Sequence, residues 1–266
     1  MVFEGADVVG KTEQVNLLLG RFAAEGIPVM GISFPRYDTP AGLALGRHLR
    51  GEISVVENDG TLDLPHVASE DALFFEALNC LDKMAAAADI VKWLSEGTSV
   101  ISSRWWQSAV IYGGDTGIPL EYLWRVYSRM PQADVNFLLV ASAETCLARR
   151  GIDRDRYERD LSKQERVREA YHTMWTSSYG AGEGWSRILD GEEPAEKVHE
   201  RVWDCLKGHS KMKRLLARAR HGRLSPEKRL EKVRAIITKS GNKLCMSKED
   251  AQEIVDFLFA ISETTT

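Results

Sequence analysis

The fold of this 266-residue chain is decided near its start by the stretch Gly5-Ala6-Asp7-Val8-Val9-Gly10-Lys11-Thr12, which matches the pattern GxxxxGK[ST]. The apolar run 2–4 precedes it, and residues 11–25 follow with apolar side chains at helical spacing. A loop placed between a strand and a helix can hold phosphate on its backbone amides and on the positive helix N-terminus. This context favours a phosphate-binding loop over a chance match in a glycine-containing turn.

The chemistry of the loop predicts its ligand. A lysine at position 11 neutralises a transferred phosphoryl group, and the hydroxyl of Thr12 is suited to ligate Mg²⁺. We therefore expect a nucleoside triphosphate and Mg²⁺ as cofactors, with Thr12 as the metal ligand. The residues expected to bind the nucleotide are Gly5, Ala6, Asp7, Val8, Val9, Gly10, Lys11, Thr12 and Glu13.

Beyond the loop, short apolar runs alternate with helical patterns as far as residue 206. Besides the run 2–4, strands are predicted at 27–34, 99–102, 135–140 and 187–189. Besides the helix after the loop, helices are predicted at 71–96, 120–129, 143–150, 162–177 and 194–206, and Thr39-Pro40 begins another. This alternation predicts an α/β fold, a three-layer sandwich in which helices cover both faces of a five-stranded parallel sheet.

Composition places the chain among soluble globular proteins. Hydrophobic residues make up 44% and charged residues 28%, as in ordinary folded domains. The sequence has no run of 18 apolar residues and no signal-peptide pattern, so we expect a cytoplasmic protein without membrane contact. The four cysteines form no CxxC pair, which argues against a zinc site or a disulfide framework. The short first strand is consistent with a chain that begins inside a longer gene.

Charge divides the chain near residue 208. The net charge of −4 is distributed as −11 over residues 1–206, +9 over 207–234 and −2 over 235–266. We therefore predict a main domain at 1–207 and a helical basic extension at 208–266. The extension either docks on the acidic body or binds nucleic acid through 207–234 by phosphate contacts. The suitably spaced basic residues are Lys211, Lys213, Arg214, Arg218 and Arg220.

Three further segments accompany the phosphate loop. They are Phe34-Pro35-Arg36-Tyr37-Asp38-Thr39-Pro40-Ala41-Gly42, Ser103-Arg104-Trp105-Trp106-Gln107-Ser108 with Tyr112-Gly113-Gly114, and the arginine-rich run 149–159. In order, they resemble the motif FPxxxTxxG, the motif DRYxxSxxAYxG and the lid of the thymidylate kinases. The stretch from Phe3-Glu4-Gly5 through Lys11-Thr12-Glu13-Gln14 resembles the opening motif FEGxDGxGKTTQ of the same family. The resemblance covers residues 2–206. The resemblance implies a P-loop kinase that transfers the ATP γ-phosphate to dTMP or a related pyrimidine deoxynucleotide.

The resemblance also assigns roles outside the phosphate loop. It implies that Arg104 and the lid residues Arg150 and Arg154 act with Lys11 on the transferred group, and that Asp190 lies on the adenine side. Val8 stands where some members carry an arginine, which others supply from the lid. The residues expected to bind the acceptor are Asp7, Phe34, Pro35, Arg36, Phe75, Asn79, Ser103, Arg104, Ser108 and Tyr112.

Physical alternatives stay open for several of these residues. Arg36 either grips the acceptor 5′-phosphate or lies in solvent on a proline-bounded turn. Arg104 either binds phosphate or stacks on Trp105 or the next tryptophan. The lid arginines alternate with aspartates, which also suits a solvated face of ion pairs. Phe75 either stacks on the base or belongs to the core.

Two positions depart from the family pattern. Ser103 stands where the family has an aspartate that helps to organise Mg²⁺ and the acceptor phosphate. Asn79, or Cys80 under a one-residue shift, stands where an arginine hydrogen-bonds thymine. Three hypotheses follow: a dTMP kinase with a relaxed base pocket, a kinase of a modified pyrimidine such as 5-hydroxymethyluracil in DNA, and a nucleotide-binding protein of kinase ancestry with weak activity.

The resemblance further implies a homodimer. The Ala-rich and largely uncharged stretch 84–90 suits close packing of two helices from different copies. Burial of the same stretch inside one monomer explains it equally well.

Overall fold

The computed structural model describes residues 1–53, 70–149, 161–176 and 185–221. In this part of the chain, parallel strands form a five-stranded sheet in the order β2-β3-β1-β4-β5. The central β1 is paired to β3 on one side and to β4 on the other. The predicted α/β fold with a five-stranded parallel sheet is thus confirmed. The strands are β1 (Val2–Glu4), β2 (Val29–Ser33), β3 (Ser99–Ser103), β4 (Val135–Val140) and β5 (Trp185–Asp190).

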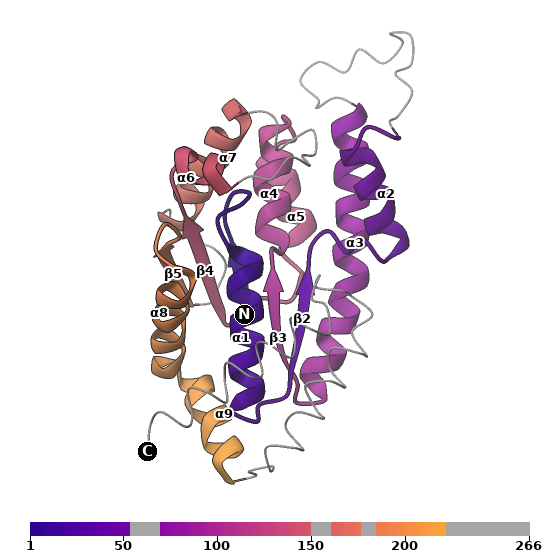
Figure 1. The fold of residues 1–266 in the computed structure, drawn as a ribbon. Coiled ribbons are helices and arrows are strands. Elements are labelled where there is room, and N and C mark those ends of the chain that lie inside the picture. Colours follow the sequence, from indigo (N-terminus) through magenta and orange to yellow (C-terminus); the bar gives the residue numbers. More distant parts are fainter. Residues whose placement is uncertain (54–69, 150–160, 177–184, 222–266) are drawn as a thin grey trace.

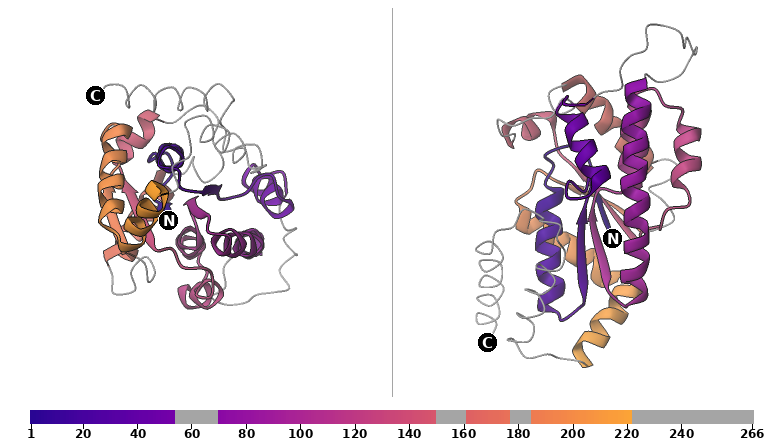
Figure 2. Two further views of the ribbon diagram at one scale, coloured as in Figure 1. Left: turned by 90° about the horizontal axis from the view of Figure 1, so that it is seen from below. Right: turned by 90° about the vertical axis from the view of Figure 1, so that its right-hand side faces the viewer.

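Helices cover both faces of the sheet, which gives the three layers seen in Figures 1 and 2. On one face lie α1 (Lys11–Ala24) and α8 (Ala195–Gly208), and on the other α3 (Glu70–Ser95), α4 (Trp106–Asp115) and α5 (Leu120–Tyr127). The remaining helices are α2 (Pro40–Leu49), which packs against α3, α6 (Ala143–Arg149), α7 (Leu161–Thr176) and α9 (Ser210–His221).

Each face of the sheet has its own apolar core. Val15, Leu18 and Phe22 of α1 are fully buried at helical spacing against the first face. Ala86 and Ile90 of α3 pack against the second face together with Trp106, Ala109 and Val110 of α4. The strands between these cores point their carboxyl ends to one edge, where parallel sheets place their ligand sites.

The helix α4 is a difference from the sequence analysis, which predicted no helix there. All its residues from Trp106 to Ile111 are buried, so the segment is apolar or neutral on every side. A helix buried all round lacks the amphipathic period by which helices are recognised in a sequence. Its length and position were therefore visible only in the folded chain.

The helix α9 shows how the start of the basic extension packs. Its Met212 is 3% exposed and belongs to the same core as α1 and α8. Lys211 forms an ion pair with Asp134 of the body, and α9 lies at the end of the sheet opposite the phosphate loop (Figure 1). This packing agrees with the docking interpretation for residues 210–216. Residues 222–266 of the predicted extension lie outside the described residues.

Within the described segments, none of the helices combines the length and the apolar character needed to cross a bilayer.

Candidate active site

The phosphate loop joins β1 to α1 at the carboxyl edge of the sheet. Gly5 has a φ of +139°, and a Cβ atom there would lie 2.4 Å from the carbonyl oxygen of Leu139 in β4. Gly10 caps α1 with a φ of +98°. Both positions require glycine, because side chains rarely tolerate this backbone. Val8 has a φ of +65°, which is strained for a β-branched residue and typical of functional loops.

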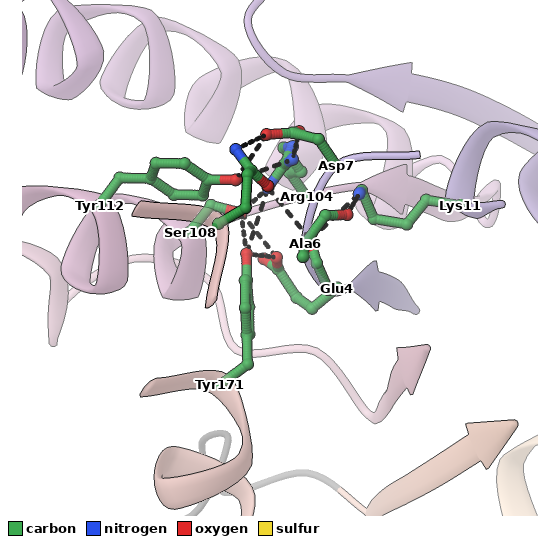
Figure 3. Close-up of polar contacts among 10 residues, drawn as sticks. Glu4, Ala6, Asp7, Lys11, Arg104, Ser108, Tyr112 and Tyr171 are labelled. Carbon is green, nitrogen blue, oxygen red and sulfur yellow. Dashed lines mark hydrogen bonds and ion pairs between the residues drawn. The ribbon is translucent and has the colours of Figure 1, made fainter. Parts of the chain in front are cut away.

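Lys11 begins α1, and its side chain turns back over the loop (Figure 3). The Nζ atom donates hydrogen bonds to the carbonyl oxygens of Gly5, at 3.0 Å, and Ala6. Burial, assisted by the like charge of Arg104, lowers the pKa of Lys11 to about 7. A cation desolvated in this way gains by binding phosphate, which fits its predicted role. Thr12 is exposed in the same first turn of α1.

Below the loop, Glu4 at the end of β1 organises a buried polar cluster. Its Oε1 accepts a hydrogen bond from the backbone N of Trp105 at 2.7 Å. Its Oε2 accepts from Ser108 Oγ at 2.6 Å and from the Tyr171 hydroxyl at 2.8 Å. Because Trp105 is the residue before α4, the carboxylate also lies at the positive end of that helix. Glu4 therefore connects β1, α4 and α7 directly under the phosphate loop.

Arg104 follows β3 and points toward the phosphate loop in Figure 3. Its Nη1 atom donates to the Gly5 carbonyl oxygen at 3.3 Å and to the Tyr171 hydroxyl at 3.2 Å. Its guanidinium lies 5.1 Å from the centre of the Tyr112 ring, rather than on a tryptophan. Like Val8, Arg104 has a left-handed backbone, with a φ of +66°. These two are the non-glycine residues with positive φ in the described part of the chain, and both lie at the site.

Asp7 is the partner of Arg104 on the loop. Its carboxylate forms an ion pair with Arg104 Nη2, and its Oδ2 accepts from the Tyr112 hydroxyl at 2.9 Å and from Gln164 Nε2 at 3.0 Å. Burial alone raises the pKa of Asp7, but the charges of Arg104 and Lys11 and these hydrogen bonds outweigh it and hold the pKa at about 2. Asp7 is therefore ionised at neutral pH.

A cavity of about 150 Å³ opens beside this cluster, between the loop after β2 and α3. It brings together most of the residues predicted to bind the acceptor. Those that line it are Asp7, Phe34, Pro35, Phe75, Asn79, Arg104, Ser108 and Tyr112. Asn79 lines the cavity, and Cys80 does not. Ser103 is buried at the end of β3, where its carbonyl oxygen accepts a hydrogen bond from the Phe34 backbone.

Arg36 is held by side chains of α3, and its role in binding the acceptor phosphate stays a prediction. Its Nε atom lies 2.9 Å from Asp82 Oδ1, its Nη2 donates to the Asp82 carbonyl oxygen at 3.0 Å, and its Nη1 lies 3.0 Å from Asp89 Oδ2. The side chain is 6% exposed and is not part of the cavity lining. The structure thus places Arg36 against two carboxylates of α3, neither in solvent nor in the acceptor cavity.

On the other side of the phosphate loop lies the turn after β5. Asp190 ends this strand, and its Oδ1 accepts a hydrogen bond from the backbone N of Glu192 at 2.9 Å. A Cβ atom at Gly191 would lie 3.0 Å from the carbonyl oxygen of Val9, so this turn contacts the loop. Arg149 donates to the Gly191 carbonyl oxygen at 2.7 Å. Arg150 and Arg154 lie outside the described residues.

The sequence analysis missed three polar residues of the site. Tyr171 and Gln164 come from α7, whose pattern showed only a helix. Lys83 lines the cavity at 2% exposure. Its spacing of four and eight residues from Asn79 and Phe75 was a usable signal, because such residues share one helix face.

Comparison with known proteins agrees with this geometry. The family model for thymidylate kinase matches residues 3–202. A thymidylate kinase of Dictyostelium discoideum is 26% identical over 172 residues, covering 64% of this chain and 70% of that protein. A probable thymidylate kinase of Pyrobaculum calidifontis is 30% identical over 201 residues, covering 75% of this chain and 91% of that protein.

A solved structure supports the fold independently. The thymidylate kinase of Candida albicans superposes with a TM-score of 0.62 at 19% identity, and the match covers 77% of this chain and 89% of the other. The family match extends from β1 into α8 and so includes the phosphate loop, the acceptor cavity and the lid segment. On these grounds the chain belongs to the thymidylate kinase family, whose members are ATP-dependent phosphotransferases that act on dTMP.

Proposed function

We propose that this chain transfers the γ-phosphoryl group of ATP to the 5′-phosphate of dTMP at the site described above. The observation that carries the proposal is that the phosphate loop and the acceptor cavity share residues. Asp7 belongs to the phosphate loop and also lines the acceptor cavity, and Arg104 contacts both it and Gly5. Phe75 supplies an aromatic wall for a base on the α3 side of the cavity.

In the proposed reaction, an oxygen of the acceptor phosphate attacks the γ-phosphorus, and the bond to the β,γ-bridging oxygen breaks to leave ADP. Charge on the transferred group is spread over its equatorial oxygens, so catalysis depends on positioned cations. Lys11 and Arg104 supply positive charge from opposite sides of the loop. We assign Arg150 and Arg154 the same role from the lid, since the loop position Val8 carries no charge.

The residues present fit a magnesium ion that is held mainly by phosphate. Mg²⁺ in such sites takes one or two protein ligands and completes its shell with water and phosphate oxygens. The exposed hydroxyl of Thr12 in the first turn of α1 suits that role. Ser103 adds no negative charge, whereas the ionised carboxylate of Asp7 lines the same cavity. When bound, the ion neutralises β- and γ-phosphate oxygens.

We also propose that two copies of the chain pair through α3. One face of this helix exposes apolar side chains to solvent, with Leu81 and Met84 at 57% and Val91 at 56%. Ala85 and Ala88 between them are exposed as well and allow close approach of a second helix. A second copy would bury the same stripe on both sides, as a two-fold interface requires.

Light scattering at micromolar concentration tests this pairing. Wild type is expected at twice the chain mass, and Met84→Glu at the mass of one chain, because the glutamates would meet across the interface. A single-chain mass for wild type contradicts the dimer.

The experiment that tests the proposed site is the activity of Lys11→Ala with MgATP and dTMP. We expect turnover to fall by roughly two or more orders of magnitude, because a contact to the transferred phosphoryl group is lost. The circular dichroism spectrum and the unfolding midpoint should stay close to those of wild type. Lys92→Met, which removes an exposed lysine of α3, is the matched control and should keep wild-type turnover. Near-normal activity of Lys11→Ala would mean that the loop does not bind the phosphoryl donor.

Binding of nucleic acid through 207–234 remains a prediction. The described residues of α9 pack on the body through Met212 and Lys211, which favours docking for that part. DNA affinity of the full chain at low and at physiological salt tests the alternative, since phosphate contacts lose affinity steeply as salt rises. If the full chain binds no DNA measurably at low salt, the nucleic-acid alternative is eliminated.

A further inference from the structure

Lys83 is a buried cation in the acceptor cavity that the roles given above do not use. Phe75, Asn79 and Lys83 are spaced by four residues on α3 and therefore share one helix face. They are 7%, 6% and 2% exposed, and all three line the cavity. A lysine almost never becomes fully buried unless a partner compensates its charge.

The partners of the ammonium group do not account for its burial. Lys83 Nζ donates a hydrogen bond to Asn79 Oδ1 and lies 5.2 Å from the centre of the Phe34 ring. Asn79 is its only hydrogen-bond acceptor among the residues that the structure describes, although an ammonium group carries three donors. Two buried donors thus remain for an acceptor that enters the cavity.

The carboxylates of Glu76, Asp82 and Glu4 act on Lys83 through charge and not through direct hydrogen bonds. The Oε2 atom of Glu76 is buried and has no hydrogen-bond partner among the described residues. Glu76 accepts a hydrogen bond from the Tyr127 hydroxyl, and Asp82 holds Arg36. Burial lowers the pKa of Lys83, and the charges of Glu76 and Asp82 oppose that effect. In the described part of the chain neither carboxylate comes within ion-pair distance of Nζ, so a structural ion pair does not explain the lysine.

The position of Lys83 indicates which part of an acceptor it faces. The cations that contact the phosphate loop are Lys11 and Arg104, from α1 and from the turn after β3. Lys83 contacts neither the loop nor Arg104 directly, although the charges of Glu4 and Arg104 reach it. It belongs to the α3 wall with Phe75, whose aromatic ring suits stacking on a base. Because helical side chains point toward the helix N-terminus, its ammonium reaches the turn of Asn79. It is therefore placed for the edge of a ring that stacks on Phe75.

We infer that Lys83, held by Asn79, reads the 4-keto oxygen of the acceptor base and so selects keto-pyrimidine over amino-pyrimidine nucleotides. An ammonium group can only donate hydrogen bonds, and it matches the C4 carbonyl of thymine or uracil. The 4-amino group of cytosine is itself a donor and would leave the buried lysine without its acceptor. This inference deepens the proposed function and rests on it for the identity of the acceptor.

The test compares binding of dTMP, dUMP and dCMP by calorimetry in wild type, Lys83→Met and Lys83→Gln, with kcat/KM measured in parallel. Lys83→Met should weaken the binding of dTMP and of dUMP by ~10-fold or more, because a hydrogen bond from a charged group is lost. Affinity for dCMP should change by less than ~3-fold. In Lys83→Gln the amide oxygen can accept from cytosine, so dCMP should bind more tightly than it does to wild type. Lys92→Met serves as the control on the same helix.

Equal weakening of all three nucleotides by Lys83→Met would assign Lys83 to the phosphate or to the fold, and it would overturn the inference. Unchanged affinity for all three would overturn it as well. A gain for dCMP in Lys83→Gln cannot arise from a damaged fold, so this variant separates base reading from structural loss. If wild type binds dTMP with the expected preference but forms no dTDP, the proposed function fails while base recognition by Lys83 stands.

Discussion

Arg36 and Asp82 form a buried ion pair that joins the loop after β2 to the middle of α3. Arg36 Nε lies 2.9 Å from Asp82 Oδ1, and the Arg36 backbone N donates to Asp82 Oδ2 at 3.0 Å. Asp82 is fully buried, and Thr39, the residue that caps α2, also donates to it at 3.3 Å. The pair thus fixes two walls of the acceptor cavity relative to each other, which makes Arg36 a positioning residue.

Removal of one member of this pair should be costly. In Asp82→Ala the guanidinium of Arg36 keeps its charge and loses its buried partner, so we expect the free energy of unfolding to fall by about 3 kcal/mol. The matched control is Asp89→Ala, because Asp89 is 50% exposed and screened by water. Its loss should cost less than about 1 kcal/mol. Urea unfolding measures the free energy of unfolding of both variants. Equal losses in Asp82→Ala and Asp89→Ala would contradict a buried ion pair between Arg36 and Asp82.

Nucleotide binding should be coupled to proton uptake by Lys11. The pKa of this lysine is lowered to about 7, so at pH 8 it is mostly neutral before binding. Phosphate favours the charged form and raises the pKa, and the protein then takes up a proton. Calorimetry of ATP binding in buffers of different ionisation enthalpy should show uptake approaching one proton at pH 8 and little at pH 6.

The variant Lys11→Arg is the control for this coupling, since arginine stays charged at both pH values. It should bind ATP with no dependence on the buffer. Wild-type binding that is independent of the buffer at pH 8 would contradict the lowered pKa.

Glu76 should make the protein less stable as pH rises. Burial raises its pKa from 4.5 to about 6, partly offset by a hydrogen bond from Tyr127 and by the charge of Lys83. Between pH 4.5 and 6 the folded state binds more protons than the unfolded state, so this contribution to stability is present below 4.5 and lost through 6. The loss amounts to about 2 kcal/mol.

The variant Glu76→Gln removes this titration. We expect its stability relative to wild type to increase from pH 4.5 to 7 as measured by urea unfolding. In contrast, Glu121→Gln alters a side chain that is 77% exposed and should leave the pH profile unchanged. Parallel profiles for Glu76→Gln and wild type would show that the buried carboxyl does not titrate in this range.

Val8 offers a test of strain in the phosphate loop. Its φ of +65° is costly for valine and free for glycine. Val8→Gly should therefore raise the free energy of unfolding by up to about 1 kcal/mol, after the entropy of glycine in the unfolded chain is counted. Val9→Gly removes a buried neighbour with ordinary backbone and should destabilise. Destabilisation by both variants would mean that the loop holds no such strain.

The sequence predicted those features that depend on local pattern. The phosphate loop is contiguous, and its glycines, lysine and flanking elements are visible without tertiary contacts. The position of Arg36 was not predictable, because its partner Asp82 lies 46 residues away on another element. Likewise, the role of Lys83 depends on the phase of α3 relative to the cavity, which only packing determines. The side chains of Tyr171 and Gln164 reach the site through the placement of α7.

The most direct test of dTMP kinase activity is product analysis after incubation of the full chain with MgATP and single acceptors. The acceptors are dTMP, dUMP, dCMP and DNA that contains 5-hydroxymethyluracil. We predict that dTDP and ADP form in equal amounts from dTMP, with far less product from dCMP or from the DNA. Phosphorylated DNA without dTDP, or ADP release that needs no acceptor, would contradict a dTMP kinase.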